Sequence, residues 1–188
     1  MARTPDIPLL RHAFFYLRHG ETESNLQGIV AGSRDVALTA LGHKQARAAA
    51  AALKGCGITA IYTSALQRAR DTADYAARAL GLAVEVVAEL GERNWGALEG
   101  KPRAARVTGA TPPGAETSEA FTRRVMSGLA KVDEGIPLIV AHAGVFRVLC
   151  NILNVSEPAD PVSNAHPIRC LPPDASRATW RFESLGEF

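Results

Sequence analysis

Four short, mainly apolar runs divide the sequence, and polar residues or glycine follow within a few positions of each. The runs cover residues 13–17, 58–62, 83–87 and 136–141. They are rich in β-branched and aromatic residues, which is typical of strands buried within a sheet. Segments with apolar residues at helical spacing separate them. This alternation predicts an α/β fold: a three-layer sandwich with a mainly parallel central sheet flanked by helices.

The expected helices follow residues that commonly cap helix N-termini. Three such residues precede segments with helical patterning: Thr39, Ser64 and Thr117. We expect the helix after Ser64 to end at Gly81 and the helix after Thr117 to end at Gly135, because glycine readily takes the left-handed conformation at helix ends.

The remaining segments are predicted mostly as loops. A further helix is expected over 145–153, directly after the last apolar run. Residues 21–35 and 101–116 lack a hydrophobic period, so both are predicted to be loops, the second one a modest lid. The proline-rich tail at 162–184 is expected to supply a terminal strand or hairpin around 179–182.

Length and charge limit the possible functions. A chain of 188 residues suits a single domain over 1–188, with a core covered on both sides. The formal net charge of +2 gives no support for general nucleic-acid binding. Four arginines do fall close together in the sequence, and a solvated loop and helix face is the simplest interpretation of them: Arg103, Arg106, Arg123 and Arg124.

Cysteine and histidine spacing argues against disulfides and metal sites. The three cysteines are widely spaced and form no CxxC pair: Cys56, Cys150 and Cys170. Three histidines show no ligand spacing with one another or with acidic residues: His12, His43 and His166. The longest apolar stretch, 136–150, is too short to span a bilayer, and the first ten residues lack an apolar leader core. We expect a cytoplasmic protein with no membrane partner, no metal and no cofactor.

Residues that suit phosphate chemistry follow three of the apolar runs. Arg18 and His19 follow the first run, Arg68 lies just beyond the second, and His142 follows the last. Since the carboxyl ends of parallel strands meet at one edge of a sheet, we expect these groups to converge. Two guanidiniums and two imidazoles suit a dianion such as a phosphoryl group.

The same residue types suggest a reaction. A neutral His19 imidazole can attack phosphorus in line and form a phosphohistidine, which water then hydrolyses. Glu92, in the segment after the third apolar run, is the expected proton donor to the departing alkoxide. Glu89 and Glu99 lie nearby and are alternatives for that role.

Four segments, in this order, resemble the signature segments of the histidine phosphatase superfamily in its phosphoglycerate mutase-like branch. They are LRHGET at 17–22, SALQRA at 64–69, ERNWGALEG at 92–100 and AHAG at 141–144. The resemblance covers roughly residues 15–153, and four motifs together are far more specific than any one of them.

The resemblance implies roles for individual residues. His19 would accept the phosphoryl group, Glu92 would act as acid and base, and four residues would bind phosphate: Arg18, Arg68, His142 and Asn25. Four others fall where the mutases contact substrate: Gly32, Trp95, Arg103 and Ala143. For the indole of Trp95, packing beneath the loop is an alternative to stacking on a ligand.

Departures from the family pattern bear on the activity. Ala143 stands where the family usually has glycine, and 113–117 contains Gly-Ala-Glu in place of Gly-Gly-Glu. The mutases carry a longer insertion with paired arginines for a substrate carboxylate, and 101–116 is too short to match it. We therefore expect a metal-independent phosphomonoesterase whose partner is a small phosphorylated metabolite, although a phosphoprotein substrate stays open. A phosphoglycerate mutase is the first alternative, and a non-catalytic phospho-ligand-binding module is the second.

Overall fold

Six strands form one sheet in the computed structural model, which describes residues 7–132, 135–156 and 162–186. The sheet order is β3-β2-β4-β1-β5-β6, and β3, β2, β4 and β1 run parallel. β5 is antiparallel to both of its neighbours. The bounds are β1 (Phe14–Arg18), β2 (Ala60–Thr63), β3 (Val84–Val86), β4 (Pro137–Ala141), β5 (Pro167–Leu171) and β6 (Arg181–Ser184).

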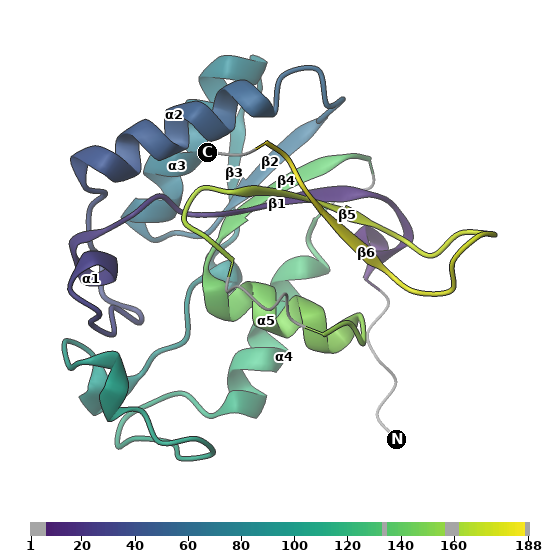
Figure 1. The fold of residues 1–188 in the computed structure, drawn as a ribbon. Coiled ribbons are helices and arrows are strands. Elements are labelled where there is room, and N and C mark those ends of the chain that lie inside the picture. Colours follow the sequence, from purple (N-terminus) through teal and green to yellow (C-terminus); the bar gives the residue numbers. More distant parts are fainter. Residues whose placement is uncertain (1–6, 133–134, 157–161, 187–188) are drawn as a thin grey trace.

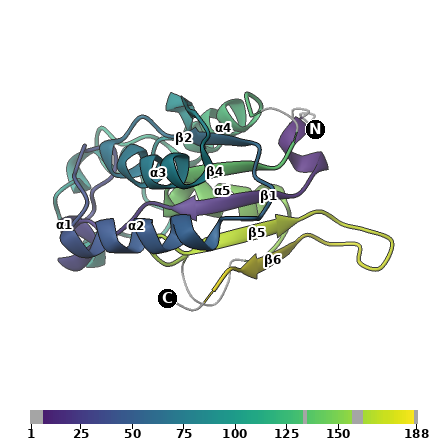
Figure 2. The same cartoon turned by 90° about the horizontal axis from the view of Figure 1, so that it is seen from above.

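Helices cover both faces of this sheet. α2 (Ala40–Ala52) and α3 (Gln67–Leu80) lie on one face, and α4 (Ser118–Leu129) and α5 (Ala143–Ile152) lie on the other (Figure 1). The view from above shows the β5–β6 hairpin extending the sheet beyond β1 (Figure 2). The predicted three-layer α/β fold with a mainly parallel sheet is confirmed.

The first four residues of β1, Phe14 to Leu17, are apolar or aromatic and buried on both faces of the sheet. Successive strand side chains point to opposite faces, so Phe14 and Tyr16 join the apolar cluster beneath α4 and α5. Phe15 and Leu17 join the cluster beneath α2 and α3. All four side chains are at most 2% exposed. The aromatic run that opens the first motif therefore forms the centre of both cores.

The helices that follow β1 and β4 cover opposite faces of the sheet. These strands are parallel neighbours, with Arg18 in register with Ala141, and the backbone N–H of His19 donates to the Ala141 carbonyl across 3.0 Å. α2, the first long helix after β1, packs on one face, whereas α5, which directly follows β4, packs on the other (Figure 1). Ligands of α/β sheets bind at such a point, outside the carboxyl ends of the strands.

Several predicted boundaries differ from the structure. The predicted loop at 21–35 contains α1 (Glu23–Leu26), which a reciprocal capping box between Thr22 and Asn25 begins. α4 ends at Leu129 instead of continuing to Gly135. The Thr39 and Thr117 caps and the left-handed Gly81 at the end of α3 are confirmed.

Ser64 is not the helix cap that its position predicts. Leu66 occupies the N-cap of α3 without a side-chain hydrogen bond, while Ser64 Oγ lies 2.7 Å from His142 Nε2. The Ser64 hydroxyl instead meets a residue at the end of another strand, because a buried imidazole nitrogen is costly without a hydrogen bond.

The C-terminal hairpin is larger than the sequence predicts. β6 begins two residues later than the strand expected around 179–182 and overlaps it at residues 181–182, and β5 begins at Pro167 and pairs with β1. Proline is tolerated as the first residue of a strand, since its missing N–H costs only one ladder bond there. In the described part of the chain, no helix combines the length and the apolar character that crossing a membrane requires.

Candidate active site

His19 lies directly after β1 and is only 5% exposed. Its Nδ1 is 2.7 Å from the Gly20 carbonyl oxygen. Because a carbonyl can only accept, Nδ1 carries the ring proton, and Nε2 holds a lone pair. Burial lowers the pKa of His19 well below its usual value, and the charges of Arg68 and Arg18 lower it further. This imidazole is therefore neutral at pH 7, with Nε2 as its nucleophilic atom.

Arg68 is the buried cation beside that nitrogen. It stands in the first turn of α3 at 1% exposure, and its Nε donates to His19 Nε2 across 3.2 Å. Its two other nitrogens donate to the carbonyls of Arg34 and Gly32, both at 2.8 Å. These contacts fix the guanidinium in place, so its position needs no reorganisation when an anion arrives.

Arg18 approaches the same site from the end of β1. Its Nη1 donates to the Val162 carbonyl across 2.7 Å, whereas its buried Nε has no hydrogen-bond partner within the described ranges. Burial lowers the pKa of Arg18 to about 10, and the charge of Arg103 adds to this effect. A buried guanidinium N–H without a partner is costly, and an anion in the site would satisfy it.

His142 caps α5 at the end of β4 and is fully buried. Its ring centroid lies 5.2 Å from that of His19, and its Nε2 contacts Ser64 Oγ. Its buried Nδ1 has no hydrogen-bond partner among the residues described. Burial lowers the pKa of His142 well below its usual value, with Arg68 the largest of the cations that contribute. Two neutral imidazoles thus stand side by side.

Glu92 is the carboxylate of the cavity. Its Oε2 accepts from the backbone N–H of Gly144 across 3.0 Å, in the first turn of α5, and its Oε1 accepts from Arg93 N across 2.8 Å. The two alternative acids are engaged elsewhere. Glu89 pairs with Lys131, and Glu99 accepts from the Ser33 backbone and hydroxyl.

The side-chain oxygen of Asn25 already has three donors nearby. It accepts from the Thr22 backbone N–H, the Thr22 hydroxyl and Asn164 Nδ2, at 3.0–3.2 Å. This saturation orients the amide, because the oxygen is turned toward these donors and the Nδ2 group is left for the cavity that Asn25 lines. Gly32 lines the same cavity, and its carbonyl holds Arg68.

A cavity of about 330 Å³ connects these groups. Nine of the ten predicted site residues line it: Arg18, His19, Asn25, Gly32, Arg68, Glu92, Trp95, Arg103 and Ala143. His142 lies immediately behind this wall. The guanidiniums of Arg93 and Arg106 sit over the Trp95 ring, 4.5 and 4.2 Å from its centroid, so Trp95 both packs and borders the cavity.

Sequence reasoning missed part of this cavity. Three further arginines line it: Arg93, Arg106 and Arg147. The sequence predicts a solvated face for Arg106 and no role for the other two. The helical spacing of Arg147 from Ala143 could have placed both on one face of α5. The prediction that Arg124 lies on a solvated face is wrong as well, because its guanidinium is engaged by other segments of the chain.

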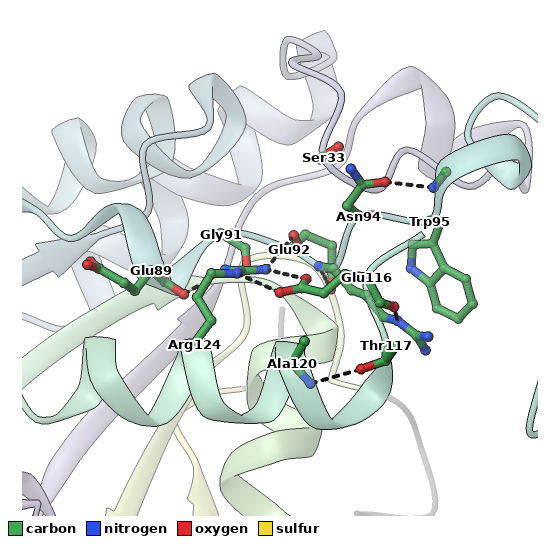
Figure 3. Close-up of polar contacts among 12 residues, drawn as sticks. Ser33, Glu89, Gly91, Glu92, Asn94, Trp95, Glu116, Thr117, Ala120 and Arg124 are labelled. Carbon is green, nitrogen blue, oxygen red and sulfur yellow. Dashed lines mark hydrogen bonds and ion pairs between the residues drawn. The ribbon is translucent and has the colours of Figure 1, made fainter. Parts of the chain in front are cut away.

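Arg124 and Glu116 form a clamp that joins α4 to the segment that carries Glu92 (Figure 3). Arg124 donates from Nε and Nη2 to the two carboxylate oxygens of Glu116, at 2.9 and 2.7 Å. Its Nη1 donates to the carbonyls of Glu89 and Gly91, at 2.8 and 3.0 Å, and its Nη2 donates to the Glu92 carbonyl at 3.3 Å. A paired, charged guanidinium thus holds the backbone on which Glu92 stands.

The arrangement is suited to binding and polarising a phosphoryl group. Arg68 donates to the lone pair of His19 and Arg18 precedes His19, the buried Nε–H of Arg18 lacks a partner within the described ranges, and the Glu92 carboxylate lines the same cavity. Among the described residues, no group of three or more His, Cys, Asp or Glu side chains could hold a metal ion.

Comparison with known proteins places the chain in a family. The model of the histidine phosphatase superfamily, branch 1, matches residues 14–171. The chain belongs to this superfamily. The resemblance seen in the four sequence segments is therefore confirmed, and the family implies a phosphorylated substrate.

Relatives within the superfamily carry the names of both enzyme types. A Bacillus subtilis (strain 168) protein described as the uncharacterized phosphatase PhoE is 37% identical over 149 residues, which cover 76% of this chain and 77% of PhoE. The probable phosphoglycerate mutase GpmB of Escherichia fergusonii is 30% identical over 156 residues, covering 82% of this chain and 69% of GpmB. The solved structure of TTHB049 from Thermus thermophilus matches with a TM-score of 0.75 at 29% identity, covering 93% of this chain and 99% of that one.

Proposed function

We propose that this protein is a metal-independent phosphomonoesterase that hydrolyses small phosphorylated metabolites through a phosphohistidine on His19. The observation that carries this proposal is the pair of contacts at the two ring nitrogens of His19, which assigns its tautomer. Nδ1 donates to the Gly20 carbonyl, so Nε2 presents its lone pair next to Arg68. This is the protonation state that a nucleophilic imidazole needs. Arg18 and Arg68 can stabilise the charge that develops on the phosphoryl oxygens.

The first half-reaction transfers the phosphoryl group to the enzyme. His19 Nε2 attacks phosphorus, the P–O bond to the alcohol breaks, and Glu92 gives its proton to the departing oxygen. Arg18, Arg68 and His142 hold the phosphoryl oxygens during transfer. The unpartnered Nε–H of Arg18 supports this assignment, because an oxyanion would complete its hydrogen bonding, and the buried Nδ1 of His142 also lacks a partner among the described residues.

The second half-reaction releases inorganic phosphate. Glu92, now a carboxylate, takes a proton from water while the water oxygen attacks phosphorus, and the P–N bond to His19 breaks. The electron pair of that bond returns to Nε2, and Glu92 regains its proton. Both the nucleophile and the acid are thus restored for another cycle.

A phosphoglycerate mutase is the second candidate, and the similarity to GpmB favours it. A mutase must exclude water and retain the dephosphorylated intermediate, which calls for an enclosing lid. Residues 101–110 in this chain are all exposed, and their regular structure is a single short turn, Arg103–Ala105. This open segment supports transfer to water over transfer back to substrate.

Product analysis separates the two enzymes. The protein is incubated with 3-phosphoglycerate and 2,3-bisphosphoglycerate, and with p-nitrophenyl phosphate in excess EDTA. We expect release of inorganic phosphate from the ester in the chelator and little 2-phosphoglycerate. Rapid formation of 2-phosphoglycerate with little phosphate release would establish the mutase, and activity lost in EDTA but restored by a divalent ion would overturn metal independence.

A further inference from the structure

Glu92 stands on a stretch of chain that lies outside both apolar clusters. Leu90 is buried in the cluster beneath α4 and α5, and the next residue of that cluster is Phe121. None of residues 91–120, all of which the structure describes, belongs to either cluster. Glu92 also lines two cavities, the catalytic one and a second one of about 570 Å³. Hydrogen bonds, more than apolar packing, therefore determine where this backbone lies.

The helix α4 lies directly against the segment before Glu92. Gly128 of α4 is buried, and a β-carbon added there would lie 2.9 Å from the β-carbon of Glu89. Residues four apart share one face of a helix, so Arg124 projects from the same face as Gly128. This close approach brings the Arg124 guanidinium within reach of the backbone carbonyls around Glu92.

Arg124 uses all three of its side-chain nitrogens in the clamp (Figure 3). Nη1 donates to the carbonyls of Glu89 and Gly91, and Nη2 donates to that of Glu92. Nε and Nη2 also donate to the two carboxylate oxygens of Glu116. The Arg124 and Glu116 side chains are only 29% and 16% exposed, so water and salt screen this bidentate pair less than they screen a surface ion pair.

Glu116 contacts the residues that follow Glu92. Its backbone N–H donates to the Asn94 carbonyl across 3.0 Å, and its carbonyl accepts from Arg93 Nε across 2.9 Å. The chain is thus held at and before Glu92 by Arg124, and after Glu92 by Glu116. Both clamp residues line the second cavity, but neither lines the catalytic cavity. Any effect that they have on the reaction is therefore exerted through other residues.

We infer that Arg124 and Glu116 are positioning residues that keep the Glu92 carboxyl aimed at the leaving oxygen. The inference rests on the proposed phosphatase function, in which Glu92 is the proton donor. The backbone N–H groups of Gly144 and Arg93 hold the carboxyl itself, whereas the clamp holds the backbone from which this side chain projects. A displacement of about 1 Å in such a group can cost on the order of 10²-fold in rate.

A leaving-group series tests this role. Arg124→Gln and Glu116→Gln are assayed with an alkyl phosphate, whose alcohol needs a proton as it leaves, and with 2,4-dinitrophenyl phosphate, whose phenolate departs well unprotonated. The measured quantity is kcat/KM, because in a two-step transfer it reports the formation of the phosphoenzyme and not its hydrolysis. We expect kcat/KM to fall about 10- to 100-fold with the alkyl ester and to change little with the aryl ester.

Two matched controls come from the same region. Arg123→Gln removes a charge from the exposed face of α4. Lys131→Gln removes an ion pair to the Glu89 side chain just beyond α4, but leaves the carbonyls that Arg124 holds untouched. Both variants should keep the kcat/KM of the unaltered protein with both esters. Thermal melting shows which variants are folded at the assay temperature, and either clamp substitution alone decides the test if the other variant unfolds.

A second measurement combines the clamp with the acid. Each clamp substitution is added to Glu92→Gln, which lacks the proton donor. Substitutions that act through one group are not additive, so the added change should cause little further loss of kcat/KM with the alkyl ester.

Three results would overturn the inference. Unchanged kcat/KM with the alkyl ester would show that the clamp does not position the acid, and equal losses with both esters would indicate a general disturbance of the site. A full additional loss in the Glu92→Gln background would show that the clamp acts independently of the acid. Failure of the proposed function looks different, because the unaltered protein would then release no phosphate, or Glu92→Gln alone would lose activity uniformly across leaving groups.

Discussion

The Nε–H of Arg68 donates to Nε2 of His19 across 3.2 Å, in a site where both side chains are almost fully buried. A protonated imidazole has no lone pair to accept this bond, so the contact requires a neutral His19. The backbone carbonyls of Gly32 and Arg34 hold the far end of Arg68. The nucleophile is therefore kept deprotonated by a cation that cannot easily turn away.

His19 should remain neutral well below the pH at which an exposed histidine takes up a proton. Burial and the two arginines lower its pKa, so the Nδ1–H tautomer should persist as the pH falls through about 6.5, where an exposed histidine takes up its proton. Long-range proton–nitrogen NMR spectra of the ring measure this directly. A titration with a midpoint near the ordinary histidine value of about 6.5 would contradict the account.

The same burial should make stability depend on pH. His19 and His142 have lowered pKa values when folded, so below about pH 6.5 the unfolded chain binds protons that the folded chain does not. The free energy of unfolding should therefore fall as the pH drops, by up to about 1.4 kcal/mol per pH unit for each histidine. Urea titrations of the protein and of His19→Gln at several pH values test this. The free energy of unfolding should change less steeply with pH in the variant, and equal pH dependence in the two proteins would contradict the prediction.

Glu92→Gln should slow turnover by about 10²–10⁴-fold for alkyl phosphates, which is the usual contribution of a general acid. The amide oxygen can keep the contact with Gly144 N and only the contact with Arg93 N is lost, so the fold should be retained. The loss should shrink for esters whose alcohols leave readily without a proton. A uniform loss across a series of leaving groups would assign the acid to another residue.

Gly144 gives a way to move the acid without changing it. A β-carbon at this position would meet the Glu92 carboxylate oxygen Oε1, whereas the Gly144 backbone already has an ordinary helical conformation. Gly144→Ala should therefore displace Glu92 and reduce alkyl phosphate turnover by about 10²-fold. Thermal melting checks that the variant folds. An unchanged rate would show that the carboxyl need not lie where it contacts α5.

The sequence predicted best what depends on patterns along a single segment. The apolar run before Arg18 identified β1, and the strand-to-helix junctions at Arg68 and His142 followed from similar runs. Since parallel strands share a carboxyl edge, these junctions could be placed together before any distance was known. Nine of the ten residues singled out for the site indeed line one cavity, with His142 behind them.

What escaped prediction depends on partners distant in the sequence. Ser64 looked like a helix cap because capping preference is local, yet its hydroxyl meets His142, 78 positions away. Arg124 looked solvated because nothing in its own helix shows that three carbonyls near Glu92 lie within its reach. Pro167 hid β5, since proline at the first position of a strand looks like a strand breaker.

The most direct test of the central claim is to trap the phosphoenzyme. The protein is mixed with a labelled phosphate ester, quenched in alkali, digested and analysed by mass spectrometry, with His19→Ala as the control. We predict one alkali-stable, acid-labile phosphoryl group on His19, and neither label nor turnover in the variant. An acid-stable label, a label on His142 or another residue, or continued turnover by His19→Ala would contradict the account.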